Sequence, residues 1–250
     1  MTVYAAADAL GCSVADEIFG PWDRTGPPYN YPEAQRMLRN SFVAGGERLT
    51  VQTVELAGRI FQQLGGPDGV LVCKHPHASI GPDEIRRHWP GHHCAVLMRN
   101  PLRALNSLFV RGWEEAAGGG SMIGYFATLA ERWLADPHRL LYEDLQRDPC
   151  GYFRRLFRAW GFGPDEGLVQ RAVRYRECAY HSSSGEKHAG DDPSRVRSER
   201  EWRVPEAIVD EYLAHPLMRE VFEAAGWPRE RAAYVQGRRG EPAPAPGGAG

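Results

Sequence analysis

Residues 94–108, CAVLMRNPLRALNSL, contain an apolar run, a fixed positive charge and the start of a helix. The run CAVLM predicts a buried strand that ends at Arg99. Asn100 and Pro101 form a typical helix start, and the helix carries Ser107 eight residues after Arg99. A guanidinium at this place is well positioned to bind a phosphate with two hydrogen bonds. The helix dipole and the Ser107 hydroxyl can support the same anion.

The rest of the chain alternates between expected strands and expected helices, which predicts an α/β fold. We expect a single domain over residues 1–235, with a parallel β-sheet flanked by helices on both faces. The other expected strands are residues 69–75 and 138–145, and the expected helices are residues 3–11, 49–64, 82–89, 101–113, 121–135, 150–161 and 205–225. Residues 20–32 and 181–198 are expected to be irregular, and the Pro/Gly/Ala-rich tail 236–250 is expected to be disordered.

Composition narrows the class of protein. The 250 residues carry a formal net charge of -2, so there is no overall basic field of the kind that binds nucleic acid. No window of eighteen apolar residues predicts a membrane span. The five cysteines form no CxxC pair, and the N-terminus has no signal-peptide pattern, so we expect a reduced, cytoplasmic setting. Nothing in the sequence indicates the oligomeric state.

Polar residues stand at the ends of all three expected strands. They are residues 74–77 (Lys-His-Pro-His), Arg99, and residues 142–144 (Tyr-Glu-Asp). Ligands of open parallel sheets bind beyond the carboxyl ends of the strands, so these residues are candidates for one site. Each also has a purely structural interpretation. Arg99 can pair with an acidic residue of the third strand end, Ser107 can face solvent or bind its own helix, and an aromatic at position 142 can belong to the edge of the core.

Two ordered motifs carry a resemblance to a known family. Residues 96–108, VLMRNPLRALNSL, resemble the 3′-phosphate-binding segment of sulfotransferases that use 3′-phosphoadenosine 5′-phosphosulfate (PAPS). Residues 139–162, RLLYEDLQRDPCGYFRRLFRAWGF, resemble the family's next segment, and residues 71–77, LVCKHPH, fall where the family has a Lys/His strand end. The resemblance covers about residues 70–162 and implies the P-loop-type sulfotransferase fold.

The resemblance also implies roles for the nucleotide-binding residues. Arg99 and Ser107 would hold the 3′-phosphate of PAPS, and Tyr142 would lie near the adenosine. Lys187, in GEKHAG, is the nearest candidate for the family's late 3′-phosphate loop, with a solvated loop lysine as the alternative. The implied reaction is sulfuryl transfer to a hydroxyl of a small-molecule or carbohydrate acceptor, without a metal.

Candidate catalytic residues lie at the first strand end. By resemblance His77 would be the general base that deprotonates the acceptor, and His75 lies on the same side of an extended segment. Lys74 would stabilise developing charge on the sulfuryl group. In other branches of the family the base is acidic and lies early in the chain, so Glu17 and, less well, Asp16 are alternatives.

The sequence departs from the family at its N-terminus. The family begins with a strand and a P-[KR]-S-G-T-[TS] loop for the 5′-phosphosulfate, and this pattern is not present in the sequence. Residues 1–12 resemble the helix that follows that loop, so we expect a truncated fold that starts one strand and one loop late. Three alternatives remain: a catalytically impaired nucleotide-binding relative, a nucleotide-dependent kinase, although no G-x-x-x-x-G-K-[ST] occurs, and a metal hydrolase using residues 75, 77, 88, 92 and 93, all histidines.

Overall fold

The computed structural model describes residues 2–16, 19, 32–46, 48–65, 69–74, 80–112, 122–163, 165–181, 187–189 and 201–235. They form a mostly helical α/β structure with two compact units. The first unit is Met1–Leu97 with Arg132–Gly190, and the second is Met98–Glu131 with Asp191–Gly250. The expected disordered tail 236–250 and the expected irregular stretch 20–31 lie outside the described residues.

A two-stranded parallel sheet organises part of the first unit. Strand β1 (Ser13–Asp16) pairs with β2 (Leu71–Lys74) over their whole lengths, from Ser13 opposite Leu71 to Asp16 opposite Lys74. Between them the chain forms α2 (Pro32–Ala44) and α3 (Val51–Gly65), and α3 contacts both strands. The apolar face of α3 packs into a buried cluster that consists of Ala15, Phe19, Leu38, Phe42, Leu49, Ala57, Ile60 and Ile80. The sheet therefore brings the carboxyl ends of β1 and β2 together.

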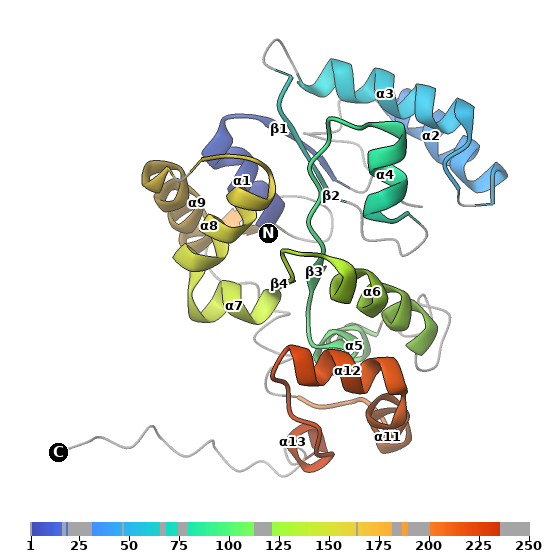
Figure 1. Cartoon of the computed structure of the whole chain (residues 1–250), viewed down its shortest axis with the longest axis vertical. Helices are drawn as coiled ribbons and strands as arrows, with labels where there is room; N and C mark the ends of the chain where they lie inside the picture. The colour runs from blue at the N-terminus through green and yellow to red at the C-terminus, as the bar shows by residue number, and fades with distance from the viewer. Residues whose placement is uncertain are drawn as a thin grey trace. The chain divides into compact units, whose positions relative to one another are not determined.

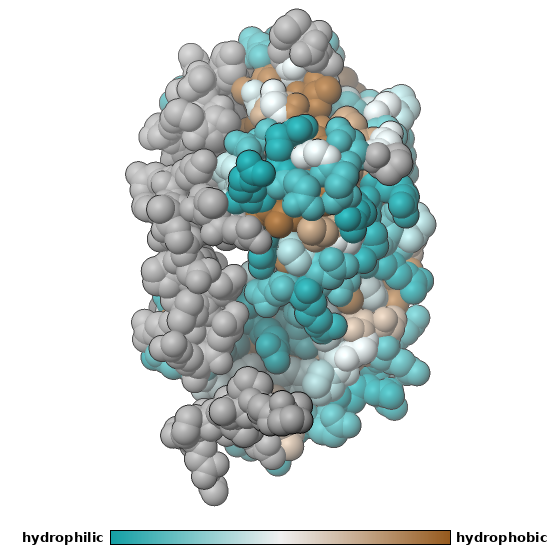
Figure 2. All heavy atoms as spheres, turned by 90° about the vertical axis from the view of Figure 1, so that its left-hand side faces the viewer, coloured by the Kyte–Doolittle hydropathy of each residue, from teal (hydrophilic) through white to brown (hydrophobic). Residues whose placement is uncertain are grey.

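Helices build the remainder of the first unit. Helix α1 (Thr2–Leu10) lies beside α9 (Glu166–Cys178), and α8 (Pro149–Ala159) packs against α9 (Figure 1). The alanine-rich face of α1 lets the two helices approach closely, because Ala5, Ala6 and Ala9 are buried in the same cluster as Ala172 and Val173. On the face drawn in Figure 2, the coloured surface is mainly hydrophilic with apolar residues interspersed. This is what amphipathic surface helices produce.

The second unit is helical and aromatic in its core. It contains α5 (Pro101–Arg111), residues 123–131 of α6 (Ile123–Ala135), α11 (Glu206–Ala214), α12 (Pro216–Ala224) and α13 (Ala232–Val235). Phe126 meets Tyr212 edge to face at 5.9 Å, and Phe222 meets Trp227 in the same way at 5.6 Å. The single helix predicted over 205–225 is two helices, because Pro216 cannot continue α11 and starts α12 instead.

The predicted strands are shorter than expected. Only Leu97–Met98 of the run 94–98 is a strand (β3), and it pairs with β4 (Leu140–Leu141). The Val96 N–H donates to the Asp136 carboxylate at 2.6 Å, so a side chain holds the backbone before β3 in place of a neighbouring strand. Residues 142–147, predicted in part as strand, form helix α7 (Tyr142–Arg147), whose first turn carries two acidic residues that suit the helix dipole.

Three further findings complete the comparison with the expected fold. Helix α4 (Pro82–His88) is as predicted, with acidic residues in its first turn and basic ones in its last. The expected irregular segment 181–198 contains β6 (Lys187–Ala189), which pairs antiparallel with β5 (Ala179–His181). The described residues contain two-stranded sheets rather than the one wide parallel sheet that was expected. Among them, no helix is long and apolar enough to cross a bilayer.

Candidate functional site

The start of α5 follows directly from the Arg99-Asn100-Pro101 sequence. Pro101 occupies the first helical position, and the Asn100 side chain caps the helix by accepting a hydrogen bond from the Arg103 N–H at 3.1 Å. Arg99 is half-buried and lies immediately before this cap. An arginine therefore comes directly before the positively polarised N-terminus of α5, and both features favour an anion.

Ser107 lies on the same face of α5 as the capping residue. It follows Asn100 by seven residues, two turns of the helix. Its exposed fraction is 6%, so the interpretation in which Ser107 faces solvent is wrong. Arg99 and Ser107, the two predicted phosphate ligands, thus belong to one unit and flank the first turns of one helix.

The predicted catalytic lysine lies in the first unit. Lys74 is the last residue of β2, and its Cα partner across the parallel pair is Asp16, the last residue of β1. This register places the predicted lysine beside the weaker of the two alternative acidic bases. The other candidates at this edge, His75, His77 and Glu17, lie outside the described residues.

The two other predicted nucleotide-binding residues lie in the first unit. Tyr142 directly follows β4, at the strand end where it was predicted, and is also the first residue of α7. It is half-buried and packs against the core cluster that contains Leu140 and Leu145. Lys187 is the first residue of β6, opposite His181, where a loop was expected.

Sequence reasoning missed two buried hydrogen-bonding side chains of the second unit. Asn106 is 1% exposed; its Nδ2 donates to the Glu201 carbonyl and its Oδ1 accepts from the Arg203 N–H, both at 2.7 Å. Tyr234 is 4% exposed, and its hydroxyl accepts from Asn100 Nδ2 at 3.1 Å. The hydrogen-bond partners of Asn106 and Asn100 are 95 to 134 residues away in the sequence, so no local pattern indicates them. The one available signal was an asparagine on the apolar side of a predicted helix.

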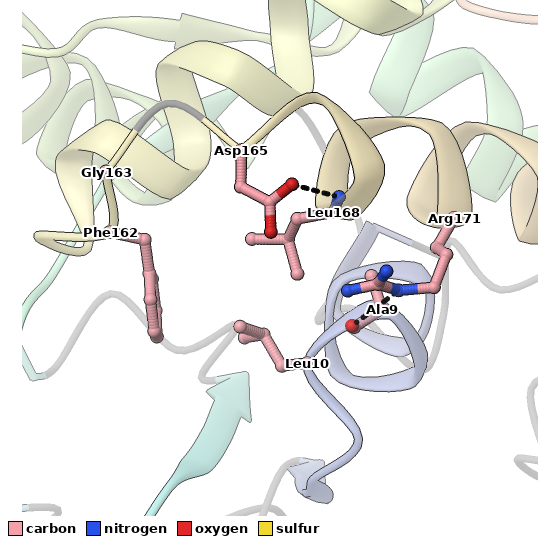
Figure 3. Close-up of a pocket in the computed structure, with 7 residues that line it drawn as sticks. All are labelled: Ala9, Leu10, Phe162, Gly163, Asp165, Leu168 and Arg171. Carbon is pink, nitrogen blue, oxygen red and sulfur yellow. Dashed lines mark hydrogen bonds between the residues drawn. The ribbon is translucent and has the colours of Figure 1, made fainter.

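A cavity of about 450 Å³ lies between α1 and the start of α9 in the first unit (Figure 3). It is lined by Ala9, Leu10, Phe162, Gly163, Asp165, Leu168 and Arg171, and includes no predicted site residue. Its two charged side chains cap helices. Arg171 Nε donates to the Ala9 carbonyl at 3.1 Å, and Asp165 Oδ1 accepts from the Gly167 and Leu168 N–H groups at 2.8 and 3.2 Å. Helix capping therefore accounts for both charged side chains of the cavity.

Aromatic rings pack beside His92, which follows α4. Trp89 lies 5.3 Å from Phe61 and 5.9 Å from His92, measured between ring centroids. Partial burial in this cluster lowers the pKa of His92, and His93 lowers it further. In the described ranges, no group of three or more His, Cys, Asp or Glu side chains is arranged to hold a metal ion.

The predicted residues that the structure describes divide between the two units. Arg99 and Ser107 are in the second, whereas Lys74, Tyr142 and Lys187 are in the first. Comparison with known proteins finds no matching family model, curated protein or solved structure.

Proposed function

We propose that this protein is a sulfotransferase that uses PAPS to sulfate a hydroxyl of a small-molecule or carbohydrate acceptor. The observation that carries the proposal is the start of α5, where Arg99 precedes an asparagine-capped helix and Ser107 is buried on the capped face. This arrangement supplies an arginine, the positive end of the helix dipole and a hydroxyl for one phosphate. It supports the interpretation of residues 96–108 as a 3′-phosphate-binding segment.

The parallel pair of β1 and β2 supports the proposed sulfuryl-transfer step. In parallel sheets, reactive groups gather beyond the carboxyl ends of the strands, and Lys74 stands at such an end. A lysine there can stabilise negative charge on the sulfuryl oxygens during in-line attack by the acceptor hydroxyl. His77 is our candidate for the base that removes the acceptor proton, with His75, Glu17 and Asp16 as alternatives. Tyr142 and Lys187 remain candidates for contacts with the nucleotide.

Binding of adenosine 3′,5′-bisphosphate tests the phosphate site. We expect this nucleotide to raise the thermal midpoint more than adenosine 5′-monophosphate does, because only the bisphosphate reaches Arg99 and Ser107. Arg99→Ala should weaken its binding by roughly ten- to one-hundredfold, as the loss of charged hydrogen bonds does, and remove the preference for the 3′-phosphate. Arg87→Ala, which removes an exposed arginine of α4, is the matched control.

The outcomes separate the candidate functions. Unchanged bisphosphate affinity in Arg99→Ala would contradict the phosphate site, and stronger stabilisation by ATP would favour a kinase.

A second assay measures transfer of the radiolabelled sulfuryl group from PAPS to a panel of hydroxyl acceptors. Lys74→Ala is expected to reduce transfer while leaving bisphosphate affinity within about twofold, since the lysine acts on the transferred group. Bisphosphate binding with no transfer to any acceptor would favour the catalytically impaired relative.

A further inference from the structure

Three hydrogen bonds in series connect the start of α5 to the C-terminal part of the second unit. The Asn100 Oδ1 accepts from the Arg103 N–H at 3.1 Å, and the Asn100 Nδ2 donates to the Tyr234 hydroxyl at 3.1 Å. The Tyr234 hydroxyl in turn donates to the Pro228 carbonyl at 2.8 Å. Both side chains are almost fully buried. Trp202 and Phe222 pack on the Tyr234 ring at 5.7 and 6.2 Å, so the hydroxyl is held in place.

The direction of these bonds explains why residue 100 is an amide. A tyrosine hydroxyl can donate one hydrogen bond, and here it donates that bond to the Pro228 carbonyl. Toward residue 100 the hydroxyl can therefore only accept. Residue 100 must donate to Tyr234 while it accepts from the Arg103 N–H, and an asparagine does both. An aspartate would cap the helix equally well but would have no proton to give to Tyr234.

We propose that Tyr234 is a positioning residue for the phosphate site, acting through Asn100 on the turn that carries Arg99. This inference rests on the proposed function, because it assigns a role in binding the 3′-phosphate. Tyr234 does not touch the ligand; it fixes the amide that caps α5. Its removal is expected to loosen the Arg99-Asn100-Pro101 turn and so to weaken anion binding in molecules that remain folded.

A double-mutant cycle on ligand affinity tests the proposal. Adenosine 3′,5′-bisphosphate is titrated calorimetrically against the full chain and against Tyr234→Phe, Asn100→Ser and the double variant, well below the thermal midpoint of each. Serine keeps the cap acceptor and removes the amide donor. We expect each single variant to weaken binding roughly three- to tenfold, as the loss of a neutral hydrogen bond does, and the double variant to be no weaker than the weaker single. Tyr152→Phe, in the first unit, is the matched control for loss of a buried tyrosine hydroxyl.

Asn100→Asp is the second arm and does not depend on the folding of Tyr234→Phe. Asn100→Asp keeps the cap acceptor but has no proton to donate to Tyr234, so we expect it to bind the bisphosphate more weakly than the wild type. Bisphosphate affinity within twofold of wild type in Tyr234→Phe or in Asn100→Asp, or additive losses in the cycle, would each overturn the positioning role while leaving the proposed function in place. No binding by the wild-type chain would overturn the proposed function, and this inference with it.

Discussion

At the residue scale, Asn106 lets helix α5 hydrogen-bond to the backbone of residues 201–203. Its amide donates to the Glu201 carbonyl and accepts from the Arg203 N–H, which is the pattern of a backbone peptide in a ladder. Asn106 is 1% exposed, and both hydrogen bonds are partly buried. Asn106 therefore anchors residues 201–203 beside α5, next to Ser107.

Asn106→Ala is expected to lower the free energy of unfolding by about 1–3 kcal/mol, because it leaves two partly buried backbone groups without their hydrogen-bond partner. Asn40→Ala, which truncates an exposed asparagine of α2, is the control and is expected to change stability by less than about 0.5 kcal/mol. Urea titration followed by circular dichroism measures both. A cost below about 1 kcal/mol for Asn106→Ala would show that water replaces the amide.

His92 gives the fold a pH dependence whose sign follows from its surroundings. Partial burial lowers the pKa of His92 in the folded chain below its ordinary value of about 6.5, and His93 adds to this effect. In the interval between the two pKa values the unfolded chain binds more protons, so stability rises with pH there. The contribution is complete above about pH 6.5 and is lost as the pH falls through that value toward the lower, folded pKa.

We expect His92→Gln to remove part of this acid sensitivity. The thermal midpoints of wild type and variant are measured from pH 7.5 to pH 5. As the pH falls, the midpoint of the wild type is expected to drop more than that of His92→Gln. The other histidines cancel in this difference. A difference that is constant over the whole range would contradict the lowered pKa of His92.

At the scale of elements, helices α8 and α12 end with the same local geometry but in different surroundings. After α8 the Phe162 N–H bonds to the Phe157 carbonyl at 2.9 Å around Gly161, whose φ is +78°. After α12 the Trp227 N–H bonds to the Phe222 carbonyl at 2.8 Å around Gly226, whose φ is +66°. A Cβ at residue 226 would meet no atom within 4 Å, whereas one at residue 161 would lie 2.9 Å from the His93 ring.

Alanine at these two glycines is expected to separate backbone strain from steric contact. Gly226→Ala should cost about 1–2 kcal/mol, the strain of a left-handed residue with a side chain. Gly161→Ala should cost more, because the His93 ring must also move. Adding His93→Ala to Gly161→Ala is expected to bring the cost down toward that of Gly226→Ala. Equal costs for the two single variants would mean that the imidazole moves away freely.

The elements also show which parts of the structure can be predicted from sequence. Helices α4, α5 and α8 begin with proline, and α1 and α8 are followed by glycine, so their limits depend on local residues and were predicted well. The strands are two to four residues long and exist through their partners. Segments this short show no clear hydrophobic period. For this reason β1 was not predicted, and β4 was predicted to be longer than it is. In the same way the start of α5 follows from local residues, whereas Tyr234 lies 134 residues from Asn100 and had no local signal.

At the scale of the whole molecule, the candidate residues belong to two units that the chain connects three times. It passes from one unit to the other after Leu97, after Glu131 and after Gly190. The first of these points lies inside β3, two residues before Arg99. The residues proposed for the 3′-phosphate are in the second unit, and the lysine proposed for sulfuryl transfer is in the first. Backbone groups of each unit therefore report separately on the two proposed sets of residues.

Hydrogen exchange with two ligands tests this division. Adenosine 3′,5′-bisphosphate is expected to slow exchange in residues 102–108 of α5, because the proposed phosphate site is at the start of that helix. PAPS carries the additional sulfuryl group, so we expect it to add protection at the ends of β1 and β2, around Asp16 and Lys74. The start of α9, residues 166–171, lines the separate cavity and is expected to be unaffected by either ligand. Protection centred on α1 and α9 would instead place the nucleotide in that cavity, and identical footprints for the two ligands would exclude Lys74 from the transfer site.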